Sequence, residues 1–234
     1  MKRFAAILCV IALSVSLASC RQQVSRQTTT AADTAAQQTT EQTTVPPQPE
    51  WQWQSSAPEE QGLNGEVFAY STANTHLLCA VVQQATGQTL YEFGKENLFD
   101  PVGMESVTCD TDAQGISDGG NGIYMSIYDM ARFGLLYLNG GEWQGEQIVP
   151  AEWVEQTTTL QFERNSGSAD YGFQWWVRTF GDNDYPAYFA QGHAGQYIFV
   201  VPELELIIAF TGNYEGRTSI YWRLANQIVN ACYE

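Results

Sequence analysis

The chain has 234 residues and a formal net charge of −16, because 26 aspartates and glutamates outnumber 10 lysines and arginines. This balance argues against a nucleic-acid-binding protein, which needs a basic surface to displace phosphate counterions, and against binding to anionic lipids by charge. Hydrophobic residues make up 44% of the chain and aromatic residues 13%, which is the composition of a globular protein with a packed core.

Residues 1–20 have the features of an export signal. A short basic start precedes an apolar run, Phe4 to Leu17, that is too short to span a bilayer. The run ends in Leu-Ala-Ser-Cys20, which resembles the bacterial lipobox, whose cysteine becomes the lipidated first residue of the mature protein. We therefore predict a lipoprotein signal peptide, lipidation at Cys20 and attachment to a membrane of the cell envelope. The alternative is a plain secretory signal cut near Ser19.

Residues 21–50 are rich in Thr, Gln and Ala, and prolines follow near the end of this stretch. The absence of apolar periodicity predicts a disordered tether, which would reach roughly 30 Å on average. We expect a single folded domain over residues 51–234, facing the periplasm or the exterior.

The first two predicted elements of this domain are helices. Thr72 or Asn74 can cap the start of the first helix, and Gly87 can close its end in a left-handed turn. A second helix is predicted over Thr89–Leu98, stopped by the turn that Asp100-Pro101 begins. The first helix carries an apolar stripe at helical spacing, made of Leu77, Leu78, Val81, Val82 and Ala85.

Two further helices are predicted in the middle of the chain. Residues 108–122 form a loop rich in Gly and Asp. Ser126 and Asp129 then fit a capping box at the start of a helix that ends at Asn139-Gly140-Gly141. A short helix over Pro150–Glu155 follows, with proline at its first position.

The last third of the chain is predicted to form strands. The turn Val201–Leu204 predicts a hairpin, and near-continuous apolar runs indicate strands covered on both faces. A closing helix is predicted over Thr218–Val229. The fold class is therefore α+β, an antiparallel sheet flanked by helices plus a helical subdomain. The predicted strands are Tyr171–Arg178, Ala187–Ala190, Gln196–Val201 and Leu204–Phe210.

Cysteines and histidines give no sign of a metal site. Outside the leader, Cys79, Cys109 and Cys232 have no paired spacing. A disulfide between Cys79 and Cys109 is one interpretation, and a small buried helix residue at Cys79 is the simpler one. His76 and His193 are too few for a His-rich site, so we predict neither a metal nor a cofactor.

Two side chains stand where they could face a cleft. Tyr70 lies in the turn before the first helix, and His193 lies between glycines at the start of a strand. Taken alone, each has a plain structural interpretation, because Tyr70 could be a half-buried turn tyrosine and His193 a surface histidine.

Seven short motifs nevertheless occur in an order that resembles the serine β-lactamase-related hydrolases. That group includes class C β-lactamases, D-alanyl-D-alanine carboxypeptidases, esterases and aminohexanoate-oligomer hydrolases. The likeness covers nearly all of residues 53–231 and implies a β-lactamase/transpeptidase-like fold that acts on small molecules or peptides with a carbonyl acyl group. The motifs are Phe68–Leu78, Ala85–Gly87, Leu98–Met104, Asp129–Gly134, Leu138–Trp143, Ile148–Pro150 and Gly192–Gly195.

The resemblance assigns roles residue by residue. Tyr70 matches the tyrosine of the family's Tyr-x-Asn motif, whose asparagine is replaced by Thr72 in this chain. The His-Ala-Gly triplet at 193 matches the Lys/His-x-Gly motif, and the N–H of Gln196 would be one oxyanion donor. The candidate catalytic residues are thus Tyr70 and His193, and the candidate substrate-binding residues are Thr72, Ala194, Gly195 and Gln196.

The family's nucleophile motif, Ser-x-x-Lys, does not occur in the sequence. The only lysines are Lys2 and Lys95, and the residue three before Lys95 is Glu92. The motif would lie between the segments that meet at Asn64 and Gly65, so the fold is expected to be incomplete there.

Loss of this motif predicts an inactive protein. Without a nearby ammonium group, Tyr70 keeps its proton, since the reference pKa of tyrosine is about 10. Losing one oxyanion donor alone typically costs roughly 100- to 1000-fold in rate. Ser71 is a weak substitute, because position 74 is asparagine rather than lysine.

The same loss should expose the apolar faces of the first helix and of the sheet, which would favour aggregation or a partner. Two alternatives to an inactive family member remain. One is a non-catalytic binding or scaffold protein of the envelope, and the other is a truncated gene product without a stable fold.

Overall fold

The computed structural model of the protein describes residues 7–10, 69–164, 169–213 and 219–232. All of them belong to one of two units into which the chain divides. The other unit, residues 15–68, lies outside the described residues. The predicted lipidation site Cys20, the predicted tether and the predicted start of the domain at residue 51 fall there as well.

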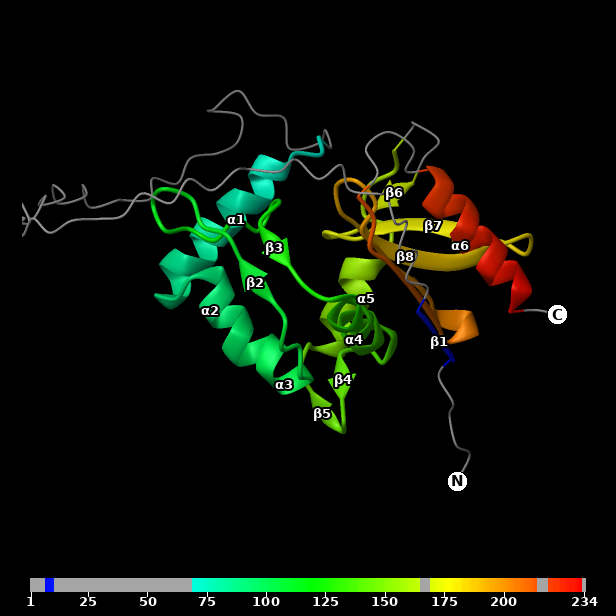
Figure 1. The fold of residues 1–234 in the computed structure, drawn as a ribbon, viewed down its shortest axis with the longest axis horizontal. Coiled ribbons are helices and arrows are strands. Elements are labelled where there is room, and N and C mark those ends of the chain that lie inside the picture. Colours follow the sequence, from blue (N-terminus) through cyan, green and yellow to red (C-terminus); the bar gives the residue numbers. More distant parts are fainter. Residues whose placement is uncertain (1–6, 11–68, 165–168, 214–218, 233–234) are drawn as a thin grey trace, which may run out of the picture. The chain divides into compact units, whose positions relative to one another are not determined.

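The largest sheet of the described unit has six strands (Figure 1). Its strand order is β1-β10-β9-β8-β7-β6. The strands from β6 to β10 pair antiparallel, as predicted, whereas β1 runs parallel to β10. The strands are β1 Ile7–Val10, β6 Asp170–Tyr171, β7 Trp176–Phe180, β8 Tyr185–Gln191, β9 Tyr197–Val201 and β10 Leu206–Phe210.

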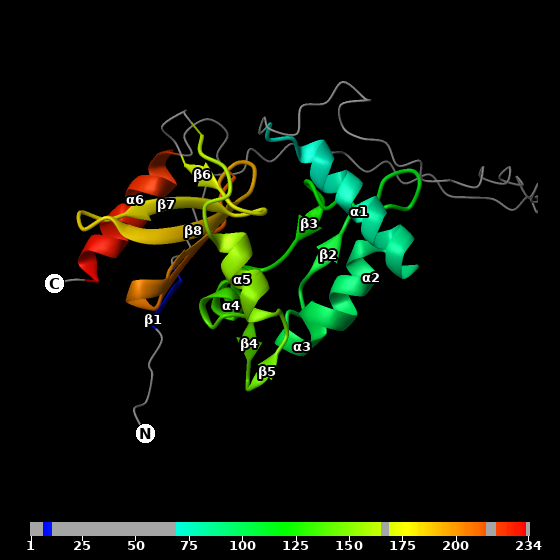
Figure 2. The same cartoon turned by 180° about the vertical axis from the view of Figure 1, so that it is seen from behind.

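Helices cover both faces of this sheet, as Figures 1 and 2 show from opposite sides. Along β9 the side chains alternate between two clusters. Tyr197 and Phe199 pack with α6, Ser219–Ala231, and Ile198 and Val200 pack with α4, Ile127–Leu138. Every residue of β9 and β10 is buried, which confirms the prediction of strands covered on both faces.

The predicted strand Tyr171–Arg178 is interrupted. The N–H of Gly172 donates to the carbonyl of Trp175 at 2.8 Å, so a turn separates β6 from β7. A Cβ at Gly172 would lie 2.2 Å from the carbonyl oxygen of Thr157, so this close backbone approach requires glycine. The predicted hairpin turn is confirmed, because a short 3₁₀-helix over Pro202–Leu204 joins β9 to β10.

The helical subdomain begins with α1, Thr72–Thr86, which ends at Gly87 in the predicted left-handed conformation, φ 74°. Its N-cap is Ser71, so the prediction of Thr72 or Asn74 as the cap was wrong by one to three residues. The next helix begins after Thr89, whose side chain and Glu92 form a complete capping box.

This second helix runs past the predicted stop at Asp100-Pro101. It consists of α2, Leu90–Gly94, a π-helical turn over Lys95–Phe99, and α3, Asp100–Val102. The N–H of Asp100 bonds to the carbonyl of Lys95 in the wider π pattern, and this accommodates the proline that follows. The helix ends at Gly103, whose backbone is in the left-handed conformation with φ 75°.

Ser126 caps α4 as predicted, since its hydroxyl accepts the N–H of Asp129 at 3.2 Å. The second half of the expected capping box is replaced, because the Asp129 carboxylate instead binds Ser106 and Arg132. The short helix α5, Ala151–Thr158, extends beyond the predicted end at Glu155.

Two further pairs of short strands complete the described elements. They are β2 Thr108–Cys109 with β3 Ile123–Tyr124, and β4 Glu142–Trp143 with β5 Glu146–Gln147.

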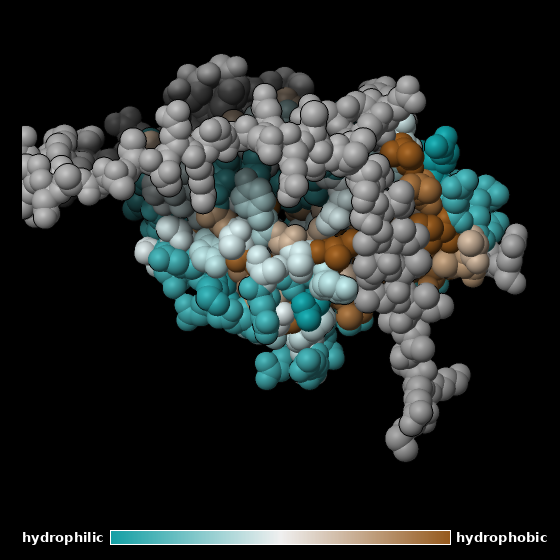
Figure 3. Space-filling view, viewed as in Figure 1, coloured by the Kyte–Doolittle hydropathy of each residue, from teal (hydrophilic) through white to brown (hydrophobic). Residues whose placement is uncertain are grey.

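The predicted exposure of apolar faces is confirmed for α1 and wrong for the sheet. Leu77, Leu78 and Val81 are 60%, 52% and 45% exposed. The faces of the sheet stay buried because α4 and α6 cover them. Strand β1 pairs with the edge of β10, but it lies within the predicted signal peptide, so cleavage before Cys20 would remove it. In Figure 3 the surface over α2 and α3 is mainly hydrophilic, and apolar residues gather nearer the sheet.

Three cysteines of the described part are free thiols, namely Cys79, Cys109 and Cys232. Cys79 is 2% exposed, which confirms the simpler interpretation of a small buried helix residue. Among the described residues, no helix has the length and apolar character needed to cross a bilayer.

Candidate functional site

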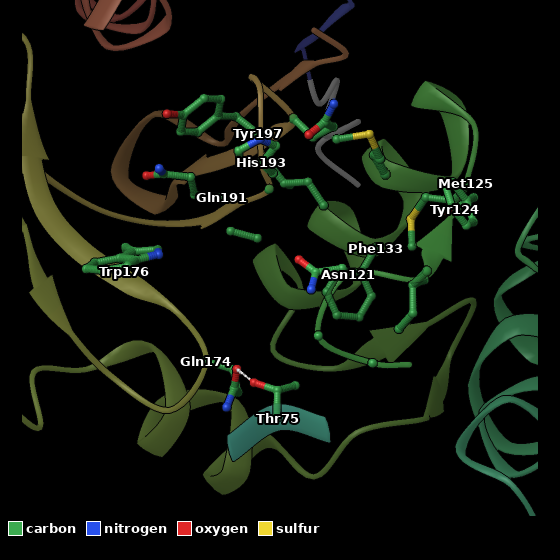
Figure 4. Close-up of a pocket in the computed structure, with 18 of the residues that line it drawn as sticks. Thr75, Asn121, Tyr124, Met125, Phe133, Gln174, Trp176, Gln191, His193 and Tyr197 are labelled. Carbon is green, nitrogen blue, oxygen red and sulfur yellow. Dashed lines mark hydrogen bonds between the residues drawn. The ribbon is translucent and has the colours of Figure 1, made fainter. Parts of the chain in front are cut away.

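A cavity of about 760 Å³ lies in the described unit where the start of α1, the loop before α4 and the end of β8 meet. Figure 4 shows Trp176 on one side of the open space and Asn121, Phe133 and Met125 on the other. His193 reaches it from the turn after β8. The cavity thus joins the helical subdomain to the sheet, which is where a rigid site would be supported.

Tyr70 is held at the cavity by aromatic contacts. Its ring lies 5.4 Å from the ring of Trp176 and 6.0 Å, edge to face, from that of Tyr171. Tyr70 is 54% exposed, so its hydroxyl is accessible to a ligand. Burial raises the pKa of the neighbouring Tyr171 to about 12, which keeps that phenol neutral. The three rings form an uncharged aromatic wall.

The turn that carries His193 is tightly constrained. Ala194 and Gly195 both have positive φ, 62° and 112°. A Cβ at Gly195 would lie 2.4 Å from the ring of Tyr221, so glycine is required here. The N–H of Gly192 donates to the carbonyl of Gln196 at 2.8 Å and closes the turn, which leaves His193 exposed toward the cavity.

Of the predicted site residues, the structure brings Tyr70, His193 and Gln196 to the cavity wall. The side chain of Gln196 donates from Nε2 to the carbonyl of Gly212 at 2.5 Å, which fixes it along the wall. Ala194 and Gly195 are buried beneath the turn rather than facing the open space.

Thr72 lies on the first turn of α1, where its methyl group packs at Gly120. The residue of this helix that reaches the cavity is Thr75, whose hydroxyl donates to Oε1 of Gln174 at 3.4 Å (Figure 4). Thr75 is one turn further along α1 than the position that matches the family's asparagine.

Several lining residues were missed by sequence reasoning. Trp176, Asn121, Gln191 and Phe133 come from four separate segments and have no common spacing. Phe133 lies in the Asp129–Gly134 motif and Gln191 directly precedes the Gly192–Gly195 motif, so their positions could have been a signal. For Trp176 and Asn121 only the aromatic or amide character could have indicated a cleft, and these residue types are common throughout the chain.

No lysine is close to Tyr70 among the described residues. Lys95 lies in the π-helical turn, and its ammonium pairs with the Asp100 carboxylate at 2.5 Å. This hydrogen bond raises the pKa of Lys95. Ser71 is exposed at the N-cap of α1. The described residues therefore offer no serine and lysine pair at the cavity.

His76 contacts two aspartates of the loop before β3 instead of lining the cavity. Its Nε2 lies 3.0 Å from a carboxylate oxygen of Asp112, and its Nδ1 lies 3.9 Å from Asp118. The Asp112 pKa is lowered, chiefly by the N–H of Ile116 and further by His76. These contacts tie α1 to the loop before β3. Within the described ranges, no group of three His, Cys, Asp or Glu side chains is arranged to hold a metal.

Sequence and structure comparisons define the class of protein. The family model for β-lactamase matches residues 21–229, so the chain belongs to the β-lactamase family. A 6-aminohexanoate-dimer hydrolase from Paenarthrobacter ureafaciens is 25% identical over 171 residues, which are 69% of this chain and 43% of that protein.

Solved structures agree with this assignment. A candidate 6-aminohexanoate-dimer hydrolase from Bacillus anthracis superposes with a TM-score of 0.64 at 29% identity, covering 73% of this chain and 45% of that one. An octameric penicillin-binding protein homologue from Pyrococcus abyssi has the same fold, with a TM-score of 0.56 at 20% identity over 72% of this chain and 44% of its own. The chain spans less than half the length of these relatives.

Proposed function

We propose that this chain is a lipid-anchored envelope protein that binds a carbonyl-bearing ligand in its cleft without forming an acyl-enzyme. The observation that carries the proposal is the lack of any Ser-x-x-Lys in the sequence, together with a cleft that retains Tyr70 and His193. Acyl transfer needs a nucleophile activated by a neighbouring base, and neither of these two side chains supplies both functions.

The chemistry of Tyr70 supports the loss of catalysis. A tyrosine acts as a base only when a nearby cation stabilises its phenolate. Its ring neighbours, Tyr171 and Trp176, are uncharged, and Lys95 is paired with Asp100. The guanidinium of Arg164 lies over the ring of Trp176 rather than against that of Tyr70. A hydroxyl with these neighbours can donate a hydrogen bond to a ligand carbonyl but is a poor proton acceptor.

Its relatives suggest the kind of bond that the ligand contains. The 6-aminohexanoate-dimer hydrolase is named for a dimer of an amino acid, whose units an amide joins, and the chain matches under half of that protein. We infer a ligand that contains an amide or an ester. Peptides and lactams belong to the same class of compounds with a carbonyl acyl group.

The proposed loss of acyl transfer is tested by incubation with a fluorescent penicillin and with an activated ester, followed by intact mass measurement. We expect the protein mass to stay unchanged, while a β-lactamase that has Ser-x-x-Lys becomes labelled in parallel. A stable acyl adduct on any serine would contradict the proposal.

The proposed lipid anchor is tested separately in a bacterial host that processes lipoproteins. We expect labelled palmitate to enter the wild-type chain and to be lost in Cys20→Ala. Cys9→Ala is the matched control, because it removes a cysteine upstream of the predicted cleavage site. Equal labelling of wild type and Cys20→Ala would exclude this anchor.

A further inference from the structure

The described wall of the cleft contains no formal charge. It has no Asp, Glu, Lys or Arg, and His193 is the only histidine among the described lining residues.

Four carboxamides supply the polar character of this wall instead. Those of Gln174 and Gln196 are engaged, with Thr75 and with the carbonyl of Gly212. Asn121 and Gln191 are exposed at the cavity, and Figure 4 shows that they come from different segments. A carboxamide both donates and accepts, so each matches the N–H and C=O of a ligand amide.

The aromatic wall gives the cleft an apolar side. Tyr70, Tyr171 and Trp176 lie with ring centroids 4.9 to 6.0 Å apart and can pack along an aliphatic chain. The nearby guanidinium of Arg164 lies over the Trp176 ring, 4.9 Å from its centroid, where the ring itself attracts the cation.

A carboxylate in this cleft would lose water without gaining a cation from the described wall, and a buried unpaired charge is costly. The whole chain adds to this effect, because its net charge of −16 repels anions. A ligand amide keeps its hydrogen bonds through Asn121 and Gln191 and carries no charge to desolvate.

We propose that the cleft selects an uncharged ligand, with secondary amides along an apolar chain, over the same ligand that bears a carboxylate. The inference rests on the proposed function in one respect, namely that the cleft binds its ligand without covalent capture.

A matched pair of probes tests this preference. The two probes are 6-acetamidohexanoate and its N-methylamide, which differ only in the charged end. Binding to the full chain is measured by calorimetry or ligand-observed NMR at neutral pH and low salt. We expect the neutral amide to bind at least about tenfold more tightly, since no cation compensates the carboxylate. Equal binding, tighter binding of the carboxylate, or no binding of either probe at millimolar concentration would overturn the proposal.

A cation placed in the wall should change the preference. Gln191→Lys adds an ammonium at an exposed lining position and should raise the affinity for the carboxylate probe about tenfold. Thr211→Lys, at the residue directly after β10, repeats the test should the first variant fold poorly. Gln114→Lys is the matched control, because it adds the same charge on an exposed loop outside the described lining. An equal gain in Gln114→Lys would mean that only the net charge matters, and would overturn the role of the wall.

Arginines beyond the lining are tested in the same assay. Arg164→Gln and Arg217→Gln should leave the preference for the neutral probe unchanged; Arg217 lies outside the described residues, six positions after Thr211. Loss of carboxylate binding in either variant would show that the arginine supplies the missing cation, against our inference.

The two proposals fail in different ways. A covalent adduct would contradict the proposal that the protein does not form an acyl-enzyme, but it would not change the measured preference between the two probes. A preference for the carboxylate probe would contradict the inference about the ligand, but it would not change the result of the mass experiment.

Discussion

Two helices of this protein have the same sequence pattern, but the apolar side chains are buried on one and exposed on the other. Both α4 and α1 repeat apolar side chains at helical spacing. On α4 the residues Met130 and Leu136 are at most 6% exposed, whereas on α1 Leu77 and Val81 are 60% and 45% exposed. The pattern predicts which face of a helix is apolar, but not whether another element covers that face.

The difference lies in what each helix meets. A Cβ at Gly134 of α4 would lie 2.9 Å from Ile198 and from Ile207, so this helix is in direct contact with the sheet. In contrast, α1 contacts the rest of the domain through the side that carries the buried Cys79, which packs against Gly119. The wide apolar stripe of α1 faces away from this anchor and contributes little to folding.

The largest predicted effect compares one substitution on the two helices. Leu136→Ala should lower the free energy of unfolding by about 2–5 kcal/mol, because it leaves a cavity among Val102, Met104 and Val107. Leu77→Ala, the matched control on α1, should change it by no more than about 0.5 kcal/mol. Urea denaturation of both variants measures the difference. A similar cost at both positions would mean that the α1 stripe is covered.

The second prediction concerns the start of α4 and pH. Burial tends to raise the pKa of the Asp129 carboxyl, but hydrogen bonds from Ser106 and Arg132, the latter at 2.6 Å, outweigh it and leave the pKa lowered. A lowered pKa in the folded state stabilises the protein above the unfolded value of about 3.9, and this contribution is lost as pH falls further.

Asp129→Asn should therefore destabilise the protein by about 1–3 kcal/mol at neutral pH, since Ser106 and Arg132 lose a charged partner. The gap between wild type and variant should narrow below about pH 4, where the wild-type carboxyl gains a proton. Thermal unfolding from neutral pH down to pH 3 measures this gap. A gap that stays constant with pH would exclude the charge of Asp129 as its cause.

The smallest effect on stability is expected on the stripe of α1. Leu77→Gln combined with Val81→Gln should leave the unfolding free energy within about 0.5 kcal/mol, while reducing self-association of the protein. Light scattering across a concentration series measures association. Unchanged scattering would show that the exposed stripe does not cause self-association.

Local signals predicted much of the fold. Gly87 ends α1 in the expected conformation, Ser126 caps α4, and the turn after Val201 makes the expected hairpin. Each of these depends on a few neighbouring residues. The interruption at Gly172 and the pairing of β1 with β10 depend on contacts between distant segments, which periodicity does not contain.

The candidate site was predicted in part for the same reason. Tyr70 and His193 lie in recognisable motifs, and both line one cavity. Trp176, Asn121 and Gln191 belong to no motif, and only the folded chain brings them together. The lack of formal charge on the described wall, on which our proposal about the ligand rests, therefore becomes evident only in three dimensions.

The π-helical turn over Lys95–Phe99 lets this segment hold one extra residue without rotating α3. Its wider turn, closed by the N–H of Asp100 on the carbonyl of Lys95, absorbs that residue. Removal of Asn97 should therefore restore a regular helix and leave Val102, now 1% exposed, facing the core. Removal of a residue from a regular helical turn would instead rotate everything after it by about 100°. The helix over residues 90–102 should thus tolerate a shortening that an ordinary helix does not.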